Sequence, residues 1–157
     1  YLGRPDANVE SFAGGLFHTG DVGYLDERGY LFLTGRKSDM YISGGSNVYP
    51  REIEELLLTD TEVAQAVVVG VPDPQWGEIG VAVIERAPST GNEGAVGADA
   101  DAEDLAERLT ALCKSGLAKY KVPKEIHFVE TMPVTAYGKL ARKELKAEYS
   151  QGRGSAR

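Results

Sequence analysis

The sequence is poor in cysteine and histidine, with only Cys113, His18 and His127 among its 157 residues. A single cysteine excludes an intrachain disulfide, a cysteine-based zinc cluster and a redox CxxC motif. Cys113 falls at apolar helical spacing in "LTALCKSG", so we predict a buried structural thiol. Neither histidine has a serine or cysteine nucleophile near it in the sequence, which favours structural roles for both.

The sequence also lacks long apolar runs: none approaches the roughly 20 residues that a membrane-spanning helix needs. We therefore expect no transmembrane segment. Nothing resembles a signal peptide, and the chain starts at Tyr1 rather than Met, so we expect a piece of a longer protein. With 42% hydrophobic residues, the chain can bury a core. Together with the lone cysteine, these features predict a cytoplasmic location.

Negative charge dominates the net balance of −7, but it is unevenly spread. Residues 1–109 carry 7 basic and 20 acidic side chains, whereas residues 110–157 carry 10 basic and 4 acidic ones. The basic end could meet an anionic ligand, or it could be the solvated face of a lysine-rich helix. Basic and aromatic residues do not interleave, so we expect no nucleic-acid partner.

Local patterns predict short strands alternating with helices. "VGYLDERGYLFLT" reads as two strands around a turn, "MYIS" as a strand before the turn "GGSN", and residues 50–58 as a helix. Three core strands follow in "AQAVVVGV", "VAVIE" and "IHFVE", with a helix from about residue 102 and another in "LARKELKAEY". Residues 87–101 read as a mobile loop insertion. The predicted class is α+β: a central three-stranded sheet flanked by helices, plus a short two-stranded hairpin.

Four motifs carry candidate chemistry: "HTGD" with Asp21, "TGRKSD" with Arg36, "SGGSNVYP", and "PVTAYGKLARKEL" with Lys139. A lysine in a glycine turn just before a helix suits an anionic phosphate or carboxylate. This turn is not a P-loop, because Pro133 takes the place of the first glycine and Leu140 that of Ser or Thr. Taken alone, Asp21 is best read as a turn cap and Arg36 as part of a surface ion pair.

In order, these motifs resemble the C-terminal region of the acyl-CoA synthetases, in the adenylate-forming superfamily, from Tyr1 to about Tyr149. The resemblance implies an AMP-forming acid–CoA ligase that uses ATP, Mg²⁺ and CoA on a fatty or aromatic carboxylic acid. It implies that residues 1–37 end a larger, β-rich N-terminal domain, that 38–149 form a mobile C-terminal domain, and that 150–157 are a disordered tail. The missing N-terminal domain would be its partner and would hold the Mg²⁺ ligands, so we expect this piece alone to be inactive.

The resemblance also implies roles for single residues. Lys139 matches the catalytic lysine of adenylation, and Asp21 and Arg36 match residues that bind the ATP or AMP ribose. Ser38 stands at the hinge position, where the family usually has Asp or Lys, and Asp39 follows it. No residue matches a metal ligand. The positions that match CoA or pantetheine contacts are Ser43, Gly44, Gly45, Trp76, Tyr120, Lys121 and Lys124; for Trp76, simple core packing is an equal alternative.

Two other functions fit the residues. One is a ligase that loads the pantetheine of a carrier protein, although "PDPQWGE" and the basic "KYKVPK" favour free CoA. The other is a non-catalytic module that binds CoA or a protein partner. The carboxylic acid substrate itself cannot be identified from these residues.

Overall fold

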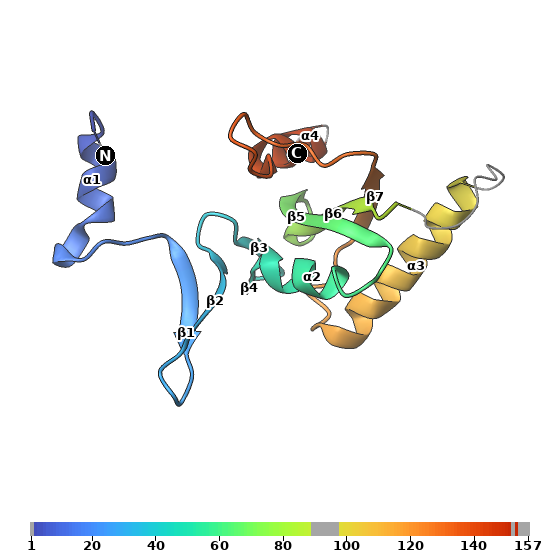
Figure 1. Ribbon diagram of the computed structural model, residues 1–157, viewed down its shortest axis with the longest axis horizontal. Coiled ribbons are helices and arrows are strands. Elements are labelled where there is room, and N and C mark those ends of the chain that lie inside the picture. Colours follow the sequence, from blue (N-terminus) through green and yellow to red (C-terminus); the bar gives the residue numbers. More distant parts are fainter. Residues whose placement is uncertain (1, 89–97, 152, 154–157) are drawn as a thin grey trace. The chain divides into compact units, whose positions relative to one another are not determined.

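The computed structural model describes residues 2–88, 98–151 and 153 of the chain. These residues form two compact units, Tyr1–Ser38 and Asp39–Arg157 (Figure 1). Helices and strands occur in both units, in line with the α+β class predicted from the sequence.

The first unit consists of a short helical segment and a β-hairpin. α1 (Pro5–Ser11) and the 3-10 turn η1 (Ala13–Gly15) precede β1 (Asp21–Leu25) and β2 (Leu31–Arg36), which pair antiparallel. The Asp26 carboxylate closes the turn by accepting hydrogen bonds from the amides of Arg28 (2.9 Å) and Tyr30 (2.8 Å). The predicted hairpin around "DERG" is confirmed. Sequence patterns missed α1 because none of its residues is buried, so it shows no clear apolar face of the kind that predicts a helix.

The second unit is built on a five-stranded sheet. Its strands are β3 (Tyr41–Ser43), β4 (Ser46–Val48), β5 (Val63–Asp73), β6 (Gly77–Arg86) and β7 (Glu125–Val129). They run in the order β4-β3-β6-β5, and β7 pairs with β6 in parallel. β5 and β6 form a long antiparallel hairpin. Among the described strands β5 pairs only with β6, so it is the end strand of the sheet.

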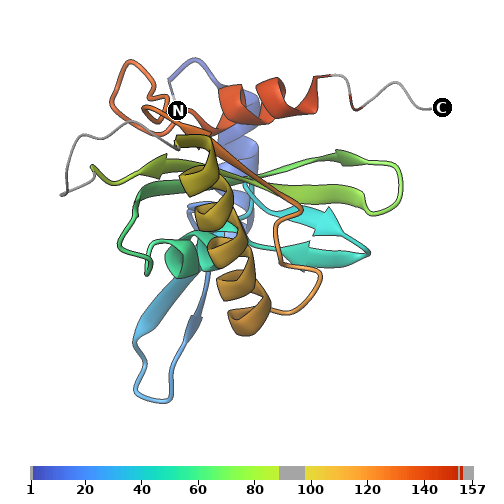
Figure 2. The same cartoon turned by 90° about the vertical axis from the view of Figure 1, so that its right-hand side faces the viewer.

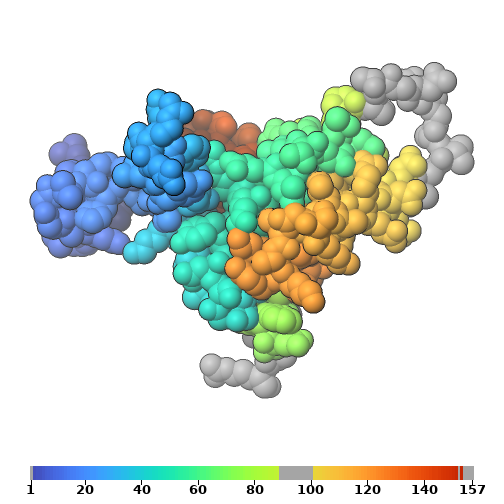
Figure 3. Space-filling view, turned by 90° about the horizontal axis from the view of Figure 1, so that it is seen from below, coloured from blue at the N-terminus to red at the C-terminus, as the bar shows by residue number. Residues whose placement is uncertain are grey.

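Helices cover both faces of this sheet. α2 (Pro50–Leu57) and α3 (Ala98–Gly116) lie on one face, and α4 (Arg142–Ser150) lies on the other (Figure 1). α2 starts at a proline, which is favoured in the first helical turn, and α3 buries Leu105, Leu109 and Cys113 at intervals of four residues. The buried Cys113 confirms the predicted structural thiol, and burial raises its pKa to about 11. α2 and α3 lie beside one another on the lower face (Figure 3).

β5 and β6 have near-continuous apolar runs because helices pack on both faces of the sheet. On one face, Ala66, Val68 and Ile84 pack with residues of α2 and α3. On the other face, alternate residues of the same strands pack with Met132 and with Leu145 of α4. Because neighbouring residues of a strand point to opposite faces, a strand buried on both sides needs apolar residues at almost every position.

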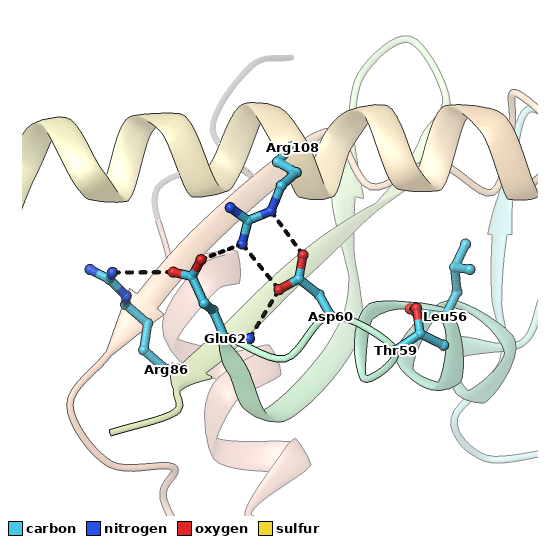
Figure 4. Close-up of polar contacts among 6 residues, drawn as sticks. All are labelled: Leu56, Thr59, Asp60, Glu62, Arg86 and Arg108. Carbon is cyan, nitrogen blue, oxygen red and sulfur yellow. Dashed lines mark hydrogen bonds and ion pairs between the residues drawn. The ribbon is translucent and has the colours of Figure 1, made fainter. Parts of the chain in front are cut away.

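Arg108 holds α3 against the chain that enters β5. Its guanidinium donates to both oxygens of Asp60 (2.9 and 3.1 Å) and to Glu62 (2.8 Å), and Arg86 lies 3.7 Å from Glu62 (Figure 4). The hydrogen bond from Arg108 lowers the pKa of Asp60. Arg108 and Glu62 are about half exposed, whereas the Asp60 side chain is 13% exposed. The exposed Arg108–Glu62 pair therefore contributes little free energy, and the hydrogen bonds to Asp60 hold α3 in place.

Two predictions about this unit, on its short hairpin and on the start of α3, need correction. The predicted short hairpin, β3–β4, is not separate from the three-stranded sheet of β5, β6 and β7. Ser43 on β3 pairs with Gly77 on β6, and the Gly44 amide donates to the Trp76 carbonyl at 2.9 Å. α3 begins at Ala98, inside the segment predicted as loop, where acidic residues such as Asp101 favour the positive end of a helix. Residues 89–97 of that segment lie outside the described residues.

The predicted disordered tail is wrong at its start. α4 extends to Ser150, and the Arg153 guanidinium pairs with the Glu125 carboxylate on β7. Arg153 also donates to the Tyr149 carbonyl at 3.1 Å, so this charge anchors the end of the helix. Residues 152 and 154–157 lie outside the described part of the chain.

Tyr41 fits between two glycines of the sheet. Gly70 and Gly80 are paired across β5 and β6. A Cβ atom at Gly70 would lie 2.2 Å from the Tyr41 Cβ, and one at Gly80 would lie 2.3 Å from the Tyr41 hydroxyl oxygen. No described residue offers that buried hydroxyl a hydrogen-bond partner, and burial raises its pKa. Both glycines are therefore required by packing.

We predict that Gly80→Ala and Gly70→Ala each destabilise the second unit by about 1 to 3 kcal/mol, because each added methyl overlaps the tyrosine. In a Tyr41→Phe background the penalty of Gly80→Ala should shrink, since the overlapping oxygen is gone. The penalty of Gly70→Ala should persist, because phenylalanine keeps the Cβ atom. Urea unfolding of wild type and these five variants measures the penalties, and equal relief at both glycines would contradict the packing.

Candidate ligand-binding surfaces

Asp21 and Arg36 face one another in the first unit. They are paired in register at the open end of the β1–β2 hairpin, and the Arg36 Nε lies 3.1 Å from an Asp21 carboxylate oxygen. The Asp21 amide donates to the Thr19 hydroxyl at 3.1 Å. The structure thus contains the surface ion pair that the sequence predicts for Arg36 when it is taken alone. Most of the Arg36 side chain is exposed, so its remaining guanidinium N–H groups are accessible to a ligand.

Ser38 and Asp39 lie at the boundary between the two compact units. Asp39 belongs to the second unit, where its carboxylate lies 3.7 Å from the Arg142 Nε. The predicted hinge pair therefore stands where one compact unit ends and the next begins. Rotation about Ser38 remains a prediction.

Gly44 and Gly45 form the tip of the β3–β4 hairpin, after the buried Ser43. Both glycines have left-handed backbones, with φ of 56° and 80°, which suits a tight hairpin turn. A Cβ atom at Gly44 would lie 2.9 Å from the Trp76 ring, whereas one at Gly45 would meet nothing within 4 Å. Gly44 therefore makes room for the indole, and Gly45 leaves the outer surface of the turn open.

Trp76 lies partly exposed in the β5–β6 turn, held by the Asp73 carboxylate, which accepts from its amide at 2.8 Å. The Lys124 ammonium lies 5.0 Å from the indole centroid, within the range of a cation–π interaction. With 37% of its surface exposed, Trp76 is not a core residue, so simple core packing does not explain it. The turn glycine, the indole and the lysine form one continuous surface.

Tyr120 and Lys121 are adjacent to this surface in the chain, but Lys121 already has a partner. Its ammonium donates to both oxygens of Glu52 at 2.7 Å. Lys121 also lies 5.9 Å from the centroid of the Tyr120 ring. Of the two lysines predicted to meet a nucleotide, only Lys124 is without a carboxylate partner among the described residues.

Lys139 lies in a tight loop between β7 and α4. The Thr135 amide donates to the Lys139 carbonyl at 2.7 Å, and the Gly138 amide to the Thr135 carbonyl at 2.9 Å. Gly138 has a φ of 73°, which the turn requires. Lys139 is exposed, and no described residue forms an ion pair with its ammonium, so this cation is accessible to an anion.

The lysine loop and the glycine turn lie in different places on the second unit. Figure 2 shows the tips of the β3–β4 and β5–β6 hairpins, in cyan and green, together at one end of the sheet. The red-orange loop before α4 lies on the other side of the same view. The second compact unit thus carries two separate candidate surfaces.

Sequence patterns missed an ion pair between the buried Glu54 and the partly buried Arg142. Arg142 donates to the two Glu54 oxygens at 2.6 and 2.7 Å, and the Val68 amide donates to Glu54 at 2.7 Å. Burial alone would lower the pKa of Arg142, but the hydrogen bonds with Glu54 and its charge raise it. Glu54 stands on the apolar face of α2 with Ile53 and Leu57, and a carboxylate at such a position signals a buried partner.

The histidines have structural neighbours, as predicted. The Nε2 atom of His18 lies 2.9 Å from the Ala13 carbonyl oxygen, and that of His127 lies 3.1 Å from a Glu125 oxygen. Across residues 2–88, 98–151 and 153, no cluster of His, Cys, Asp or Glu side chains could hold a metal ion. Within the same residues, no helix is both long and apolar enough to cross a membrane.

Comparison with known proteins finds a matching family and several similar proteins. Residues 52–139 match the family described as AMP-binding enzyme C-terminal domain. The chain is 44% identical over 146 residues to a 2-succinylbenzoate–CoA ligase from a Geobacillus species, covering 93% of this chain and 27% of that protein. The chain therefore spans about a quarter of the length of the curated relatives it matches.

Solved structures show the same relation. The o-succinylbenzoate CoA synthetase from Bacillus subtilis, in complex with its acyl-adenylate intermediate, is 39% identical with a TM-score of 0.77. The alignment covers 93% of this chain and 27% of that one. A Mycobacterium tuberculosis fatty acyl CoA synthetase is 37% identical with a TM-score of 0.65, covering 96% of this chain and 27% of that one.

We predict that Gly44→Ala shifts the fluorescence emission of Trp76, the only tryptophan in the sequence. The added methyl would overlap the indole ring and push it toward solvent, which gives a red shift. Gly45→Ala is the matched control, because it imposes a similar left-handed strain of about 1 kcal/mol without touching Trp76. Equal spectra for the two variants would show that the indole does not depend on Gly44.

Proposed function

This chain belongs to the family of AMP-binding enzyme C-terminal domains, and we propose that it is the C-terminal part of an ATP-dependent acid–CoA ligase. The observation that carries this proposal is 44% identity to a CoA ligase over 93% of the chain, which includes every motif singled out in the sequence. The resemblance drawn from those motifs is confirmed at the level of the family. The activity, substrates and partners of the whole protein are part of the proposal.

The proposed reaction has two steps. In the first, a carboxylate oxygen attacks the α-phosphorus of ATP, the bond to pyrophosphate breaks, and an acyl-adenylate forms. In the second, the CoA thiolate attacks the acyl carbonyl carbon, the bond to the AMP oxygen breaks, and AMP leaves as the thioester forms. The first step brings two anions together, so it requires preorganised positive charge.

Lys139 supplies that charge in the proposed first step. Its ammonium is exposed on a hydrogen-bonded loop and has no carboxylate partner among the described residues, so it can contact the substrate carboxylate and the α-phosphate. Asp21 can accept hydrogen bonds from the two ribose hydroxyls, and Arg36 can donate to the same sugar. Mg²⁺ would neutralise phosphate charge during this step. In this proposal its protein ligands belong to the rest of the enzyme, as the family resemblance implies.

The glycine turn serves the proposed second step. Gly45 leaves open space where a Cβ atom would point, and Trp76 provides an aromatic wall beside it, which suits the flexible pantetheine arm. Lys124 lies over the indole and can contact a phosphate of the CoA nucleotide. Because the two surfaces are separate, the second unit would rotate about Ser38 and Asp39 between the steps.

The proposed substrate is an aromatic or fatty carboxylic acid. The relatives named above act on 2-succinylbenzoate and on fatty acyl groups, which is consistent with both classes. A pyrophosphate-release assay of the full-length protein, with a panel of aromatic and fatty acids, tests the function. Absence of ATP-dependent and acid-dependent pyrophosphate release with every acid would overturn it.

We predict that Lys139→Ala and Gly45→Leu impair different half-reactions in the full-length protein. Lys139→Ala should slow adenylate formation about a hundredfold or more, because it removes a preorganised cation. Supplied with preformed acyl-adenylate, the same variant should transfer the acyl group to CoA at a near-normal rate. Gly45→Leu should do the reverse, because its side chain would fill the open surface of the turn.

Two control variants test whether these effects are specific. Lys143→Ala removes a neighbouring exposed lysine and should leave both half-reactions intact. Gly45→Ala has the same backbone strain as Gly45→Leu but little bulk, and should retain most of the transfer activity. If Lys139→Ala slows transfer from preformed adenylate as much as it slows adenylation, the assignment of separate surfaces is wrong.

The Lys121–Glu52 pair gives a further prediction about the thiol acceptor. If Lys121 contacts the CoA nucleotide, it must leave Glu52, so Glu52→Gln should lower KM for CoA severalfold without changing adenylation. Glu55→Gln, on the same helix but paired with Arg51, is the matched control. An unchanged KM for CoA would remove Lys121 from the site. If transfer also succeeds only with a carrier-protein pantetheine, CoA is not the acceptor.

A further inference from the structure

The Lys139 loop is closed by hydrogen bonds between its own residues. Its two ends meet where the Ala141 amide donates to the Pro133 carbonyl at 2.9 Å, and Val134 forms a bridge with Leu140. The loop therefore keeps its own shape. The direction in which it presents Lys139 depends on how its two ends are attached.

Each end of the loop is held by one buried or partly buried carboxylate. On the β7 side, the Met132 amide donates to Glu85 at 2.6 Å. On the α4 side, Arg142 binds Glu54 through two hydrogen bonds and donates to the Val68 carbonyl at 3.3 Å. Arg142 is the first residue of α4 and follows Lys139 by three positions, so it is the nearest charged anchor to that lysine.

The Glu54–Arg142 pair connects the two faces of the sheet at its β5 edge. Glu54 comes from α2 on one face, and Arg142 comes from α4 on the other (Figure 1). They meet at Val68 of the end strand β5, where Glu54 accepts from its amide and Arg142 donates to its carbonyl. Backbone groups at a strand edge have no partner in the sheet, so this pair satisfies the backbone of Val68 and joins the two helical layers.

We propose that Arg142 is a positioning residue, which fixes the orientation of the Lys139 loop through Glu54 and the edge of β5. The proposal rests on the proposed role of Lys139 in adenylate formation. Lys139 is exposed and has no partner among the described residues that would orient its side chain, so the backbone under it must be rigid. The planar guanidinium, held at two points, provides this rigidity, and a lysine ammonium could not reproduce the paired geometry.

A hydrogen-exchange experiment on this chain tests the structural half without any assay of activity. Arg142→Gln should increase amide exchange at Thr135, Gly138, Lys139 and Ala141 by about tenfold or more, while the core of α3 stays protected. Arg153→Gln is the matched control, because it breaks the ion pair at the opposite end of the same helix. It should leave the loop amides unchanged.

Half-reaction kinetics of the full-length protein test the functional half. Arg142→Gln and Glu54→Gln should reduce adenylate formation about a hundredfold, the cost expected for a displacement of about 1 Å in a catalytic group. Transfer from preformed acyl-adenylate to CoA should stay within about threefold of wild type. Arg142→Lys keeps the charge without the paired hydrogen bonds, and should show a smaller loss in the same half-reaction. Arg153→Gln should show no such difference.

The outcomes separate this inference from the proposed function. If wild-type protein forms no adenylate with any acid, the proposed function fails, and the role of Arg142 falls with it even if the loop amides exchange faster. If wild type is active but the loop amides of Arg142→Gln exchange at wild-type rates, the positioning role is wrong. Equal losses in both half-reactions, for Arg142→Gln or for a folded Arg142→Lys, would show a merely structural ion pair and also overturn it.

Discussion

The β5–β6 ladder, buried on both faces, is the constraint on which the second unit depends. Its alternate residues pack against α2 and α3 on one side and against α4 on the other. A slip of one residue in the ladder would exchange the two sets of side chains, so the register is strongly specified. The turn of this ladder carries Trp76, and its first β6 residue, Gly77, pairs with Ser43. The ladder therefore also sets where the glycine turn lies.

Polar interactions complete this apolar framework at the margins of the sheet. Glu54 and Arg142 bind the backbone of Val68 at the outer edge of β5. Glu78 accepts from the Ile42 amide at 3.0 Å and from Lys146 at the same distance. Such contacts add little free energy when exposed but are costly to break when buried, since a lone buried charge remains. The two networks share this asymmetry: Glu54 is 9% exposed and Asp60 is 13% exposed, whereas their partners Arg142 and Arg108 are 28% and 49% exposed.

Much of the fold could be predicted because its signals are local. Apolar runs predicted β5, β6 and β7, and Pro50 with Ile53 and Leu57 predicted α2. The start of α3 was missed because a segment rich in glycine, alanine and acid precedes it and hides the beginning of the helical pattern. The tail was misread because the pairing of Arg153 with Glu125 joins residues far apart in the chain.

The sequence by itself determined the family, the residue types at the candidate surfaces and most of the elements, because periodicity and motifs are properties of neighbouring residues. Only the tertiary structure decided which of those residues are engaged: Lys121 is held by Glu52, Arg36 by Asp21, and Lys139 by none of the described residues. It also revealed that Arg142, three positions from Lys139, meets a carboxylate 88 residues away. Pairings of this kind depend on how the layers pack around the sheet, and no local pattern encodes that geometry.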